Sequence, residues 1–330
     1  MEQQYGDEIR EKPFDAAPAL TRPQGPGGQP LSPHHQRAAA SIRTILVGSS
    51  GGSASNGAIE LACRLANRFG AHLEGFHVIL DPVAVFAAVG VGDGLAVSGD
   101  VVGGMIDDAD AMAVKAKASF KEVAARHRLP PQHLAQIAAA RDCEPSAGWR
   151  AETGDPSQLV AERARFFDLI VLGRSSRVVD EPSSNTIEAV LSRSGRPVLL
   201  APAETPAEMG KFVALAWNGS PQAVRALAAS VPLLEAAESV MLITVGGGAD
   251  SDIPAVLDHL AWHGIAAKHR RVPATSTEST GILLLNAAHD SGADMLVMGG
   301  YGHQPWREAL FGGMTRDIIG TSLVPLLLMH

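Results

Sequence analysis

The sequence is poor in aromatic residues, in cysteine and in clustered positive charge, and each shortage excludes a class of protein. Only 5% of the 330 residues are aromatic although 46% are hydrophobic, so Ala, Gly and small aliphatic side chains must fill much of any core. Its two cysteines, Cys63 and Cys143, lie far apart without metal-ligand spacing, and we expect reduced structural thiols. The net charge is −8 and no basic cluster is present, which argues against direct DNA or RNA binding.

Long uninterrupted apolar runs are missing as well. The most apolar segment, residues 80–105, is broken by Asp81, Pro82, Asp93 and Asp100. Its clean stretches are shorter than the ~20 residues that a membrane-spanning helix needs. The first residues are charged and lack the apolar core of a signal peptide. We therefore expect a cytoplasmic protein that does not enter a membrane.

The amino-terminal 41 residues differ in composition from the rest of the chain. They contain six prolines among Gly and Gln residues. Such a segment cannot bury enough apolar surface to offset its loss of conformational entropy. Residues 1–41 are therefore predicted to be a disordered tail.

From residue 42 onward, apolar strand-like runs alternate with helix-like segments in two successive series. The first series of predicted strands comprises residues 44–48, 72–79, 148–152, 169–172 and 197–202. The second comprises residues 212–217, 239–245, 267–272, 295–298 and 325–329. This alternation predicts an α/β fold with two tandem doubly wound, Rossmann-like parallel-sheet domains, at residues 42–203 and 211–330.

The first series carries an insertion that the second lacks. An apolar loop spans Val83–Gly104, and a helix is predicted over residues 107–128 with Ala109, Met112 and Phe120 among its inward positions. Exposed apolar segments usually have a partner, so this loop is a candidate surface for self-association.

A glycine-rich loop follows the predicted strand at residues 295–298. Glycine permits positive φ and leaves no Cβ in the way, so such a loop can wrap an anion while the next helix directs its N–H groups at the same point. The loop therefore predicts a phosphate-binding site. Its candidate ligand-binding residues are Gly299, Gly302, His303, Gly312, Gly313 and Thr315.

An internal repeat relates this loop to the first half. Residues 167–173 (FDLIVLG) match residues 293–299 (ADMLVMG). Counting on from Gly173 with the spacing of the second loop reaches Ser176 and then Thr186, so two of three glycines are replaced. This indicates a tandem repeat with a retained loop in the second copy and a degenerate loop in the first.

The spacing of Gly299, Gly302 and Gly312, with two and nine residues between them, resembles the nucleotide loop of the universal stress protein family, in particular its ATP-binding branch. The resemblance covers residues 42–330. It implies two tandem universal stress domains, with ATP or a related nucleotide, together with Mg²⁺, bound by the second. At the end of the first strand of that domain stands Asn218, where the ATP-binding members have aspartate; the resemblance places it near the base or ribose.

The resemblance also implies a function and an assembly. A bound nucleotide would be sensed, or hydrolysed slowly at most, and would change contacts with partner proteins during stress, so no classical enzyme is expected. Family members pair domains through their last strands. Residues 197–202 and 325–329 are therefore expected to meet inside one chain as an intramolecular pseudo-dimer that covers two sheet edges.

Two other classes of function remain open. A stress-related scaffold that binds no nucleotide is favoured by Gly313, which stands where the family has Ser or Thr. An adenylating enzyme is suggested by residues 50–55 (SGGSAS), which resemble the loop of PP-loop enzymes but carry Ala54 in place of its aspartate. A metal site is not expected, since His259 and His263 lie four residues apart without an evident third ligand.

Overall fold

The computed structural model describes residues 42–81, 99–132, 144–174, 184–202, 204, 206, 208–300 and 313–330. The predicted tail at residues 1–41 lies outside them. The strands are β1 Thr44–Gly48, β2 His72–Leu80, β3 Ser146–Gly154, β4 Leu169–Gly173, β5 Val198–Ala201, β6 Phe212–Ala216, β7 Ser239–Val245, β8 Ala267–Val272, β9 Met295–Gly299 and β10 Leu326–Met329. The helices are α2 Ser53–Phe69, α4 Gly99–Arg126, α6 Pro156–Ala164, α7 Ser184–Arg193, α8 Pro221–Leu234, α9 Ile253–Trp262, α10 Thr280–Asp290 and α11 Gly313–Thr321, with a 3₁₀ turn η1 at Asp250–Asp252.

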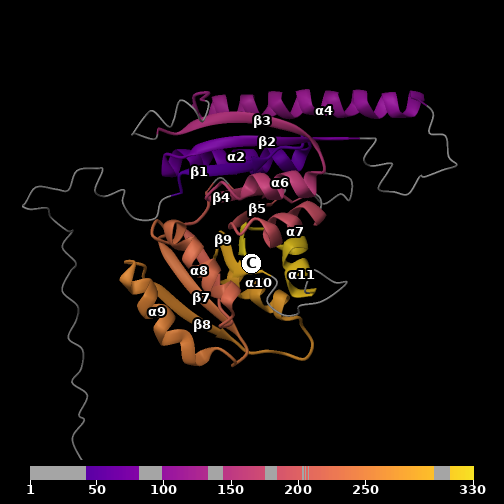
Figure 1. The fold of residues 1–330 in the computed structure, drawn as a ribbon. Coiled ribbons are helices and arrows are strands. Elements are labelled where there is room, and N and C mark those ends of the chain that lie inside the picture. Colours follow the sequence, from indigo (N-terminus) through magenta and orange to yellow (C-terminus); the bar gives the residue numbers. More distant parts are fainter. Residues whose placement is uncertain are drawn as a thin grey trace, which may run out of the picture. The chain divides into compact units, whose positions relative to one another are not determined.

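Within these residues the strands form one ten-stranded sheet in the order β3-β2-β1-β4-β5-β10-β9-β6-β7-β8 (Figure 1). Each half follows the same order of third, second, first, fourth and fifth strand, and the strands of each half pair in parallel. The prediction of an α/β fold with two tandem doubly wound sheets is therefore confirmed.

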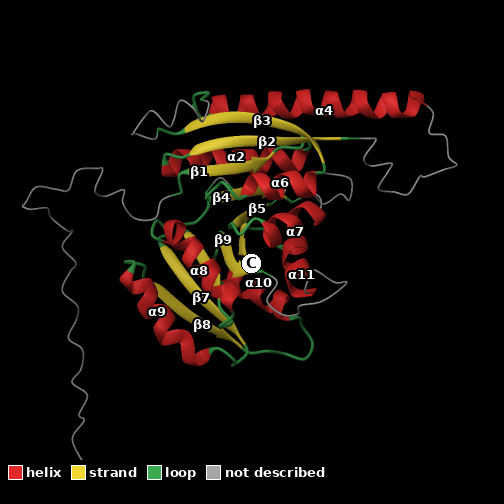
Figure 2. Ribbon diagram, viewed as in Figure 1, coloured by secondary structure: helices red, strands yellow, loops and turns green. Residues whose placement is uncertain are grey.

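Helices lie on both faces of the sheet (Figure 2), and its central strands are buried, whereas the edge strands β3 and β8 are partly exposed. Successive residues of β1 illustrate this, because Ile45 and Val47 belong to one apolar cluster and Leu46 to the other. All three are fully buried. Continuous apolar runs are what a parallel strand covered on both faces requires.

In both halves an aspartate side chain accepts two backbone hydrogen bonds at the start of the first strand. Asp168 accepts hydrogen bonds from the backbone N–H groups of Arg43 (2.9 Å) and Thr44 (3.0 Å). Asp294 accepts equivalent bonds from Gly210 (2.8 Å) and Lys211 (3.0 Å). The aspartate that precedes the fourth strand therefore fixes the entry of the first strand in each half.

Side chains that cap helix starts account for several element boundaries. Asp155, Ser220 and Ser279 each accept a hydrogen bond from the backbone N–H three residues on, at the starts of α6, α8 and α10. Gly70 ends α2 in the left-handed conformation with φ of 64°. Local sequence therefore determines where these helices begin and end.

Helix α4 differs from its prediction. It begins at Gly99 instead of residue 107, so residues 99–104 of the predicted apolar loop are helical; residues 83–98 lie outside the described part. Ala116, Phe120 and Val123 are buried as expected, but Met112 is 43% exposed. The buried residues of α4 lie in its carboxyl-terminal half, whereas its earlier turns are largely exposed.

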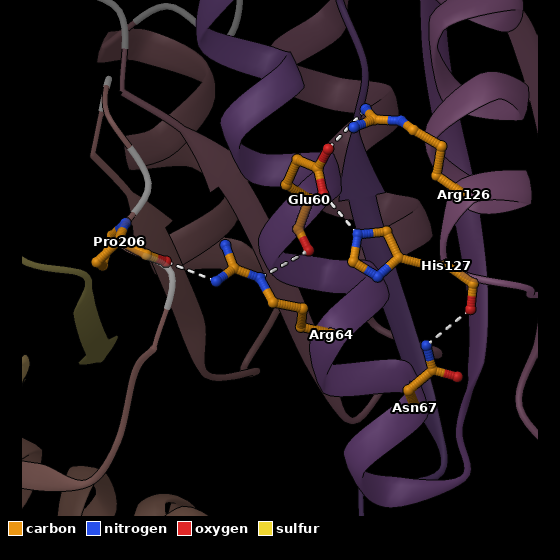
Figure 3. A network of polar contacts seen from close by, with 6 residues as sticks. All are labelled: Glu60, Arg64, Asn67, Arg126, His127 and Pro206. Carbon is orange, nitrogen blue, oxygen red and sulfur yellow. Dashed lines mark hydrogen bonds and ion pairs between the residues drawn. The ribbon is translucent and has the colours of Figure 1, made fainter.

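A polar network ties α4 and the segment between the halves to α2 (Figure 3). Glu60 of α2 pairs with Arg126 (2.6 Å) at the end of α4 and with His127 (2.5 Å) beyond it. Arg64, one turn along α2, donates to the carbonyl oxygen of Pro206 (2.5 Å). Helix α2 therefore anchors two neighbouring segments through its polar face.

The halves join through β5 and β10, which pair antiparallel with Leu199 opposite Leu327. Arg174, directly after β4, crosses between the halves and donates to the carbonyl oxygens of Ile319 (2.8 Å) and Ser322 (2.6 Å). These groups belong to the last turn of α11 and the residue after it.

In the described part of the chain, no helix is long and apolar enough to cross a membrane.

Candidate functional site

Each half has one point where the strand order reverses, between the first and fourth strands, and the carboxyl ends of such strands are where α/β sheets bind ligands. The same turn follows the first strand in both halves. Ser49 N–H donates to the Phe76 carbonyl (2.9 Å), and Trp217 N–H donates to the Ile243 carbonyl (2.9 Å). Ser49 and Trp217 therefore occupy equivalent positions, and the next residue, Ser50, matches Asn218.

In the second half, Asn218 is exposed beyond β6. Its side-chain oxygen accepts hydrogen bonds from the backbone N–H (3.1 Å) and the hydroxyl (2.7 Å) of Ser220. Ser220 in turn accepts from Ala223 N–H (3.2 Å) at the start of α8. The Asn218 oxygen therefore shapes this turn, and its amide group is the part that remains to donate to a ligand.

Gly299 ends β9 where the sheet meets the first turn of α8. A Cβ at this position would lie 2.7 Å from the backbone nitrogen of Ala223 and 2.7 Å from the carbonyl carbon of Gln222. Only glycine fits so close to a backbone. Gly299 therefore allows β9 and α8 to approach, which brings the start of the glycine loop to the turn that carries Asn218.

The remaining residues of the predicted loop are only partly described. Gly313 begins α11, and Thr315 is buried within its first turn, 4% exposed. Gly302, His303 and Gly312 lie outside the described residues. The structure therefore brings Asn218 and Gly299 to the same edge of the sheet and leaves the middle of the loop undescribed.

Thr186, the residue that the count from Gly173 matched with Gly312, lies within α7 and is buried. The pairings of Ile170 with Val198 and of Leu296 with Leu326 set both halves in the same register. Gly312 lies outside the described residues, so the match between the two positions stays a prediction.

Two groups of the second half, one of them directly before Asn218, were not revealed by the sequence. Trp217 is 7% exposed, and its indole N–H has no hydrogen-bond partner among the described residues. Asp250 of η1 pairs with Arg271 through one carboxylate oxygen (3.0 Å), while within the same part of the chain the other oxygen is buried without a partner. Buried polar atoms of this kind are rare and indicate a water or a ligand. In the sequence, the only indication of either group was a tryptophan directly after the apolar run that predicts the first strand of the second half.

The first half contains a cavity of about 190 Å³ at the carboxyl ends of β1, β2 and β4. Phe76 and Val78 of β2 and Leu172 of β4 form apolar walls, and Ala109 and Met112 of α4 lie along another side. This half was predicted to carry the degenerate loop. Its loop lacks the glycines, but its switch point contains a well-defined pocket.

His77 of β2 provides a polar group in that cavity. Its Nδ1 lies 2.6 Å from the carbonyl oxygen of Ser49, and since a carbonyl only accepts, Nδ1 carries the hydrogen. Burial lowers the pKa of His77 below its usual value, which favours the neutral ring. The Nε2 atom of a neutral ring protonated at Nδ1 is a hydrogen-bond acceptor.

The hydroxyl groups at the start of α2 are directed at each other. Ser50 N–H donates to Ser55 Oγ (3.3 Å), and Ser55 Oγ donates to the Gly52 carbonyl (2.8 Å). The two hydroxyl oxygens are 3.1 Å apart. Because these groups satisfy one another, the turn gives no support to the adenylating-enzyme alternative.

Other candidates for chemistry are structural. Burial raises the pKa of Cys63 to about 12, so its thiol is not a nucleophile at neutral pH. The rings of His259 and His263 have centroids 4.9 Å apart, and the described residues contain no group of three His, Cys, Asp or Glu side chains that could hold a metal.

Two solved structures align with most of the chain. A universal stress protein from Archaeoglobus fulgidus has a TM-score of 0.61 at 14% identity, over 87% of this chain and 95% of its own. A functionally unknown protein from Pseudomonas aeruginosa PAO1 has a TM-score of 0.50 at 14% identity, over 90% and 94%. No protein-family model and no curated protein matches the sequence.

These alignments, together with the repeated strand order, define the class of the protein. It is a tandem α/β protein in which the universal stress protein fold occurs twice in one chain. At 14% identity the likeness concerns the fold, so the ligand and the partners must be argued from the residues of this chain.

Proposed function

We propose that this chain acts as a cytoplasmic stress-response regulator of the universal stress protein family, that its second half binds ATP or a related nucleotide, and that it signals through contacts with partner proteins. The observation that carries the nucleotide proposal is the buried, unpartnered indole N–H of Trp217, described above, at the switch point beside Asn218. A nitrogenous base or a ribose offers acceptors for that donor.

The surrounding groups fit the same ligand. The Asn218 amide would donate, and the buried oxygen of Asp250 that has no partner among the described residues would accept from a ribose hydroxyl or an exocyclic amine. Gly299 lies at the start of the loop whose glycine spacing predicts phosphate binding. The nucleotide would supply a sensed ligand whose presence alters partner contacts.

Titration calorimetry with Mg-ATP, preceded by mass spectrometry for co-purified nucleotide, tests the proposal. One site per chain is expected. Trp217→Phe keeps an aromatic side chain of smaller size, removes the N–H and should weaken binding about 5- to 30-fold. Trp262→Phe is the matched control, because Trp262 is 89% exposed on α9 and its substitution should change nothing.

Absence of binding would instead favour the scaffold without nucleotide. One observation supports that alternative, namely that the Asn218 oxygen is already engaged by Ser220. Two sites per chain would mean that the first half also binds nucleotide, contrary to its degenerate loop.

We further propose that the halves act as an intramolecular pseudo-dimer, supported by the antiparallel pairing of β5 with β10. The partner surface would include residues 83–98 and the adjoining turns of α4, where Ile106 (43% exposed) and Val114 (70% exposed) present apolar side chains. Sedimentation as a monomer at high concentration would argue against self-association there.

A further inference from the structure

The equivalence of Ser49 and Trp217 explains why the first half has its cavity. Both residues follow the first strand and make the same backbone bond. In the second half the indole of Trp217 packs into the apolar cluster that contains Ala223 and Ile253. In the first half the small side chain of Ser49 stands in that position and lines the cavity. The two switch points are therefore shaped for different ligands.

The size and lining of the cavity restrict what it can hold. At about 190 Å³ it is somewhat larger than an apolar cavity of about 150 Å³ engineered in another protein, which binds benzene. It therefore has room for a small ring system. In the described part of the chain, no Lys, Arg, Asp or Glu lines it. A charged ligand would lose its hydration without gaining an ion pair.

His77 supplies the specificity. Its side chain is 5% exposed and lines the cavity, and within the described residues its only hydrogen bond is the one that Nδ1 donates to Ser49. Trp149 stacks on the ring with centroids 6.3 Å apart and helps to fix its orientation. The remaining atom, Nε2, has no hydrogen-bond partner among the described residues, so it can accept a hydrogen bond from a ligand or a water.

We propose that this cavity binds an uncharged aromatic small molecule that carries one N–H or O–H group, such as an indole or a phenol, with that group donating to His77 Nε2. The rings would contact Phe76, Leu172 and Met112, which already form the walls. This site is separate from the nucleotide site proposed for the second half.

Indole and indene form a matched pair of probes because they share a shape and differ in the N–H. Titration of the full-length protein, followed by calorimetry and ligand-observed NMR, should show one indole site with a dissociation constant of about 1 mM or below. Indene should bind about 2- to 12-fold more weakly, as the loss of one neutral hydrogen bond predicts. His77→Phe should remove the preference for indole over indene.

A second pair of variants locates the site without disturbing the core. Ala109 lines the cavity from α4, so Ala109→Trp should fill it and abolish indole binding. Ala111 is exposed on the same helix, and Ala111→Trp should leave binding unchanged. Circular dichroism melting curves confirm that both variants are folded.

Several results would overturn the proposal. These are indole binding that survives Ala109→Trp, equal affinity for indole and indene, or absence of indole binding up to its solubility limit. Mg-ATP binding should be the same in Ala109→Trp as in the unmodified protein. Failure of the nucleotide proposal would therefore appear in the ATP titration alone, and failure of this one in the indole titration alone.

Discussion

The two switch points share the same backbone turn after the first strand and differ in single side chains around it. The strand register makes His77 of β2 and Thr244 of β7 equivalent positions in the two halves. His77 donates to the turn of the first half, whereas the Thr244 hydroxyl lies 3.0 Å from His269 Nε2 on the neighbouring strand. One exchange at one strand position thus changes both the polar group presented at the sheet edge and its bonding partner.

Gly299 provides a sharp test at this scale. Gly299→Ala should lower the free energy of unfolding by about 1–3 kcal/mol, because the new Cβ would lie 2.7 Å from the backbone of α8 and must displace it. Gly320 of α11 is the control, since a Cβ there meets nothing within 4 Å. Gly320→Ala should raise stability by up to about 1 kcal/mol through helix propensity.

Urea unfolding followed by circular dichroism measures both changes. If Gly299→Ala proved as harmless as Gly320→Ala, the close approach of β9 to α8 would not exist in solution. Mg-ATP affinity should also fall in Gly299→Ala, because the displaced helix start carries the turn of Asn218.

Some site residues could be predicted from the sequence and others could not, because some features are local in the chain and others depend on how strands pair. Gly299 and Asn218 were found because glycine spacing and position after a strand are local features. The roles of His77 and Trp217 depend on the register of one strand against the next and on the space beyond it. Neither can be read from periodicity along one segment.

At the scale of elements, one buried ion pair joins β2 to α6. Glu74 is 5% exposed, and both of its carboxylate oxygens accept from Arg163, each at 2.7 Å. Hydrogen bonding to Glu74 raises the pKa of Arg163 above its usual value, which keeps the pair charged. The corresponding position of the second half is Met241, so the fold itself does not require a charge there.

This pair predicts a non-additive double mutant. Glu74→Met or Arg163→Met alone should destabilise the protein by about 3–5 kcal/mol, because each leaves a largely buried charge without its partner. The double variant should lie within about 1 kcal/mol of the unmodified protein, as buried ion pairs are often replaced by apolar residues at little cost. Urea unfolding of all four proteins gives the coupling energy. A double variant as unstable as the sum of the single ones would contradict it.

Element boundaries were predicted best where burial or a cap marks them. Strands β7 and β8 match their predicted ranges, and α10 lies between the capping residues Ser279 and Ser291. Strand β3, an edge strand, was predicted two residues too short at each end. Its amino end begins with a buried serine and its carboxyl-terminal half is largely exposed, so no apolar run marks either end. Residues 99–106 of α4 were missed because residues 104–106 are exposed and no buried stripe sets a helical period there.

At the scale of the whole described chain, the junction between the halves concentrates on β5, β10 and Arg174. Strand pairing covers an edge that each half would otherwise expose. Arg174 is 9% exposed, and burial lowers its pKa to about 10, so it remains charged at neutral pH. Its charge is compensated by carbonyl groups at the carboxyl end of α11, the negative end of that helix.

The pseudo-dimer proposal therefore predicts that the halves stay together without their covalent link. A protease site inserted between residues 203 and 208 should be cleavable while both fragments co-elute in size-exclusion chromatography. Arg174→Met leaves the α11 carbonyls without donors and should weaken the association by about 3 kcal/mol, roughly a hundredfold. Lys117→Met, on the exposed face of α4, is the control and should not change it. Separation of the unmodified fragments at micromolar concentration would show that the link, and not the shared sheet, holds the halves together.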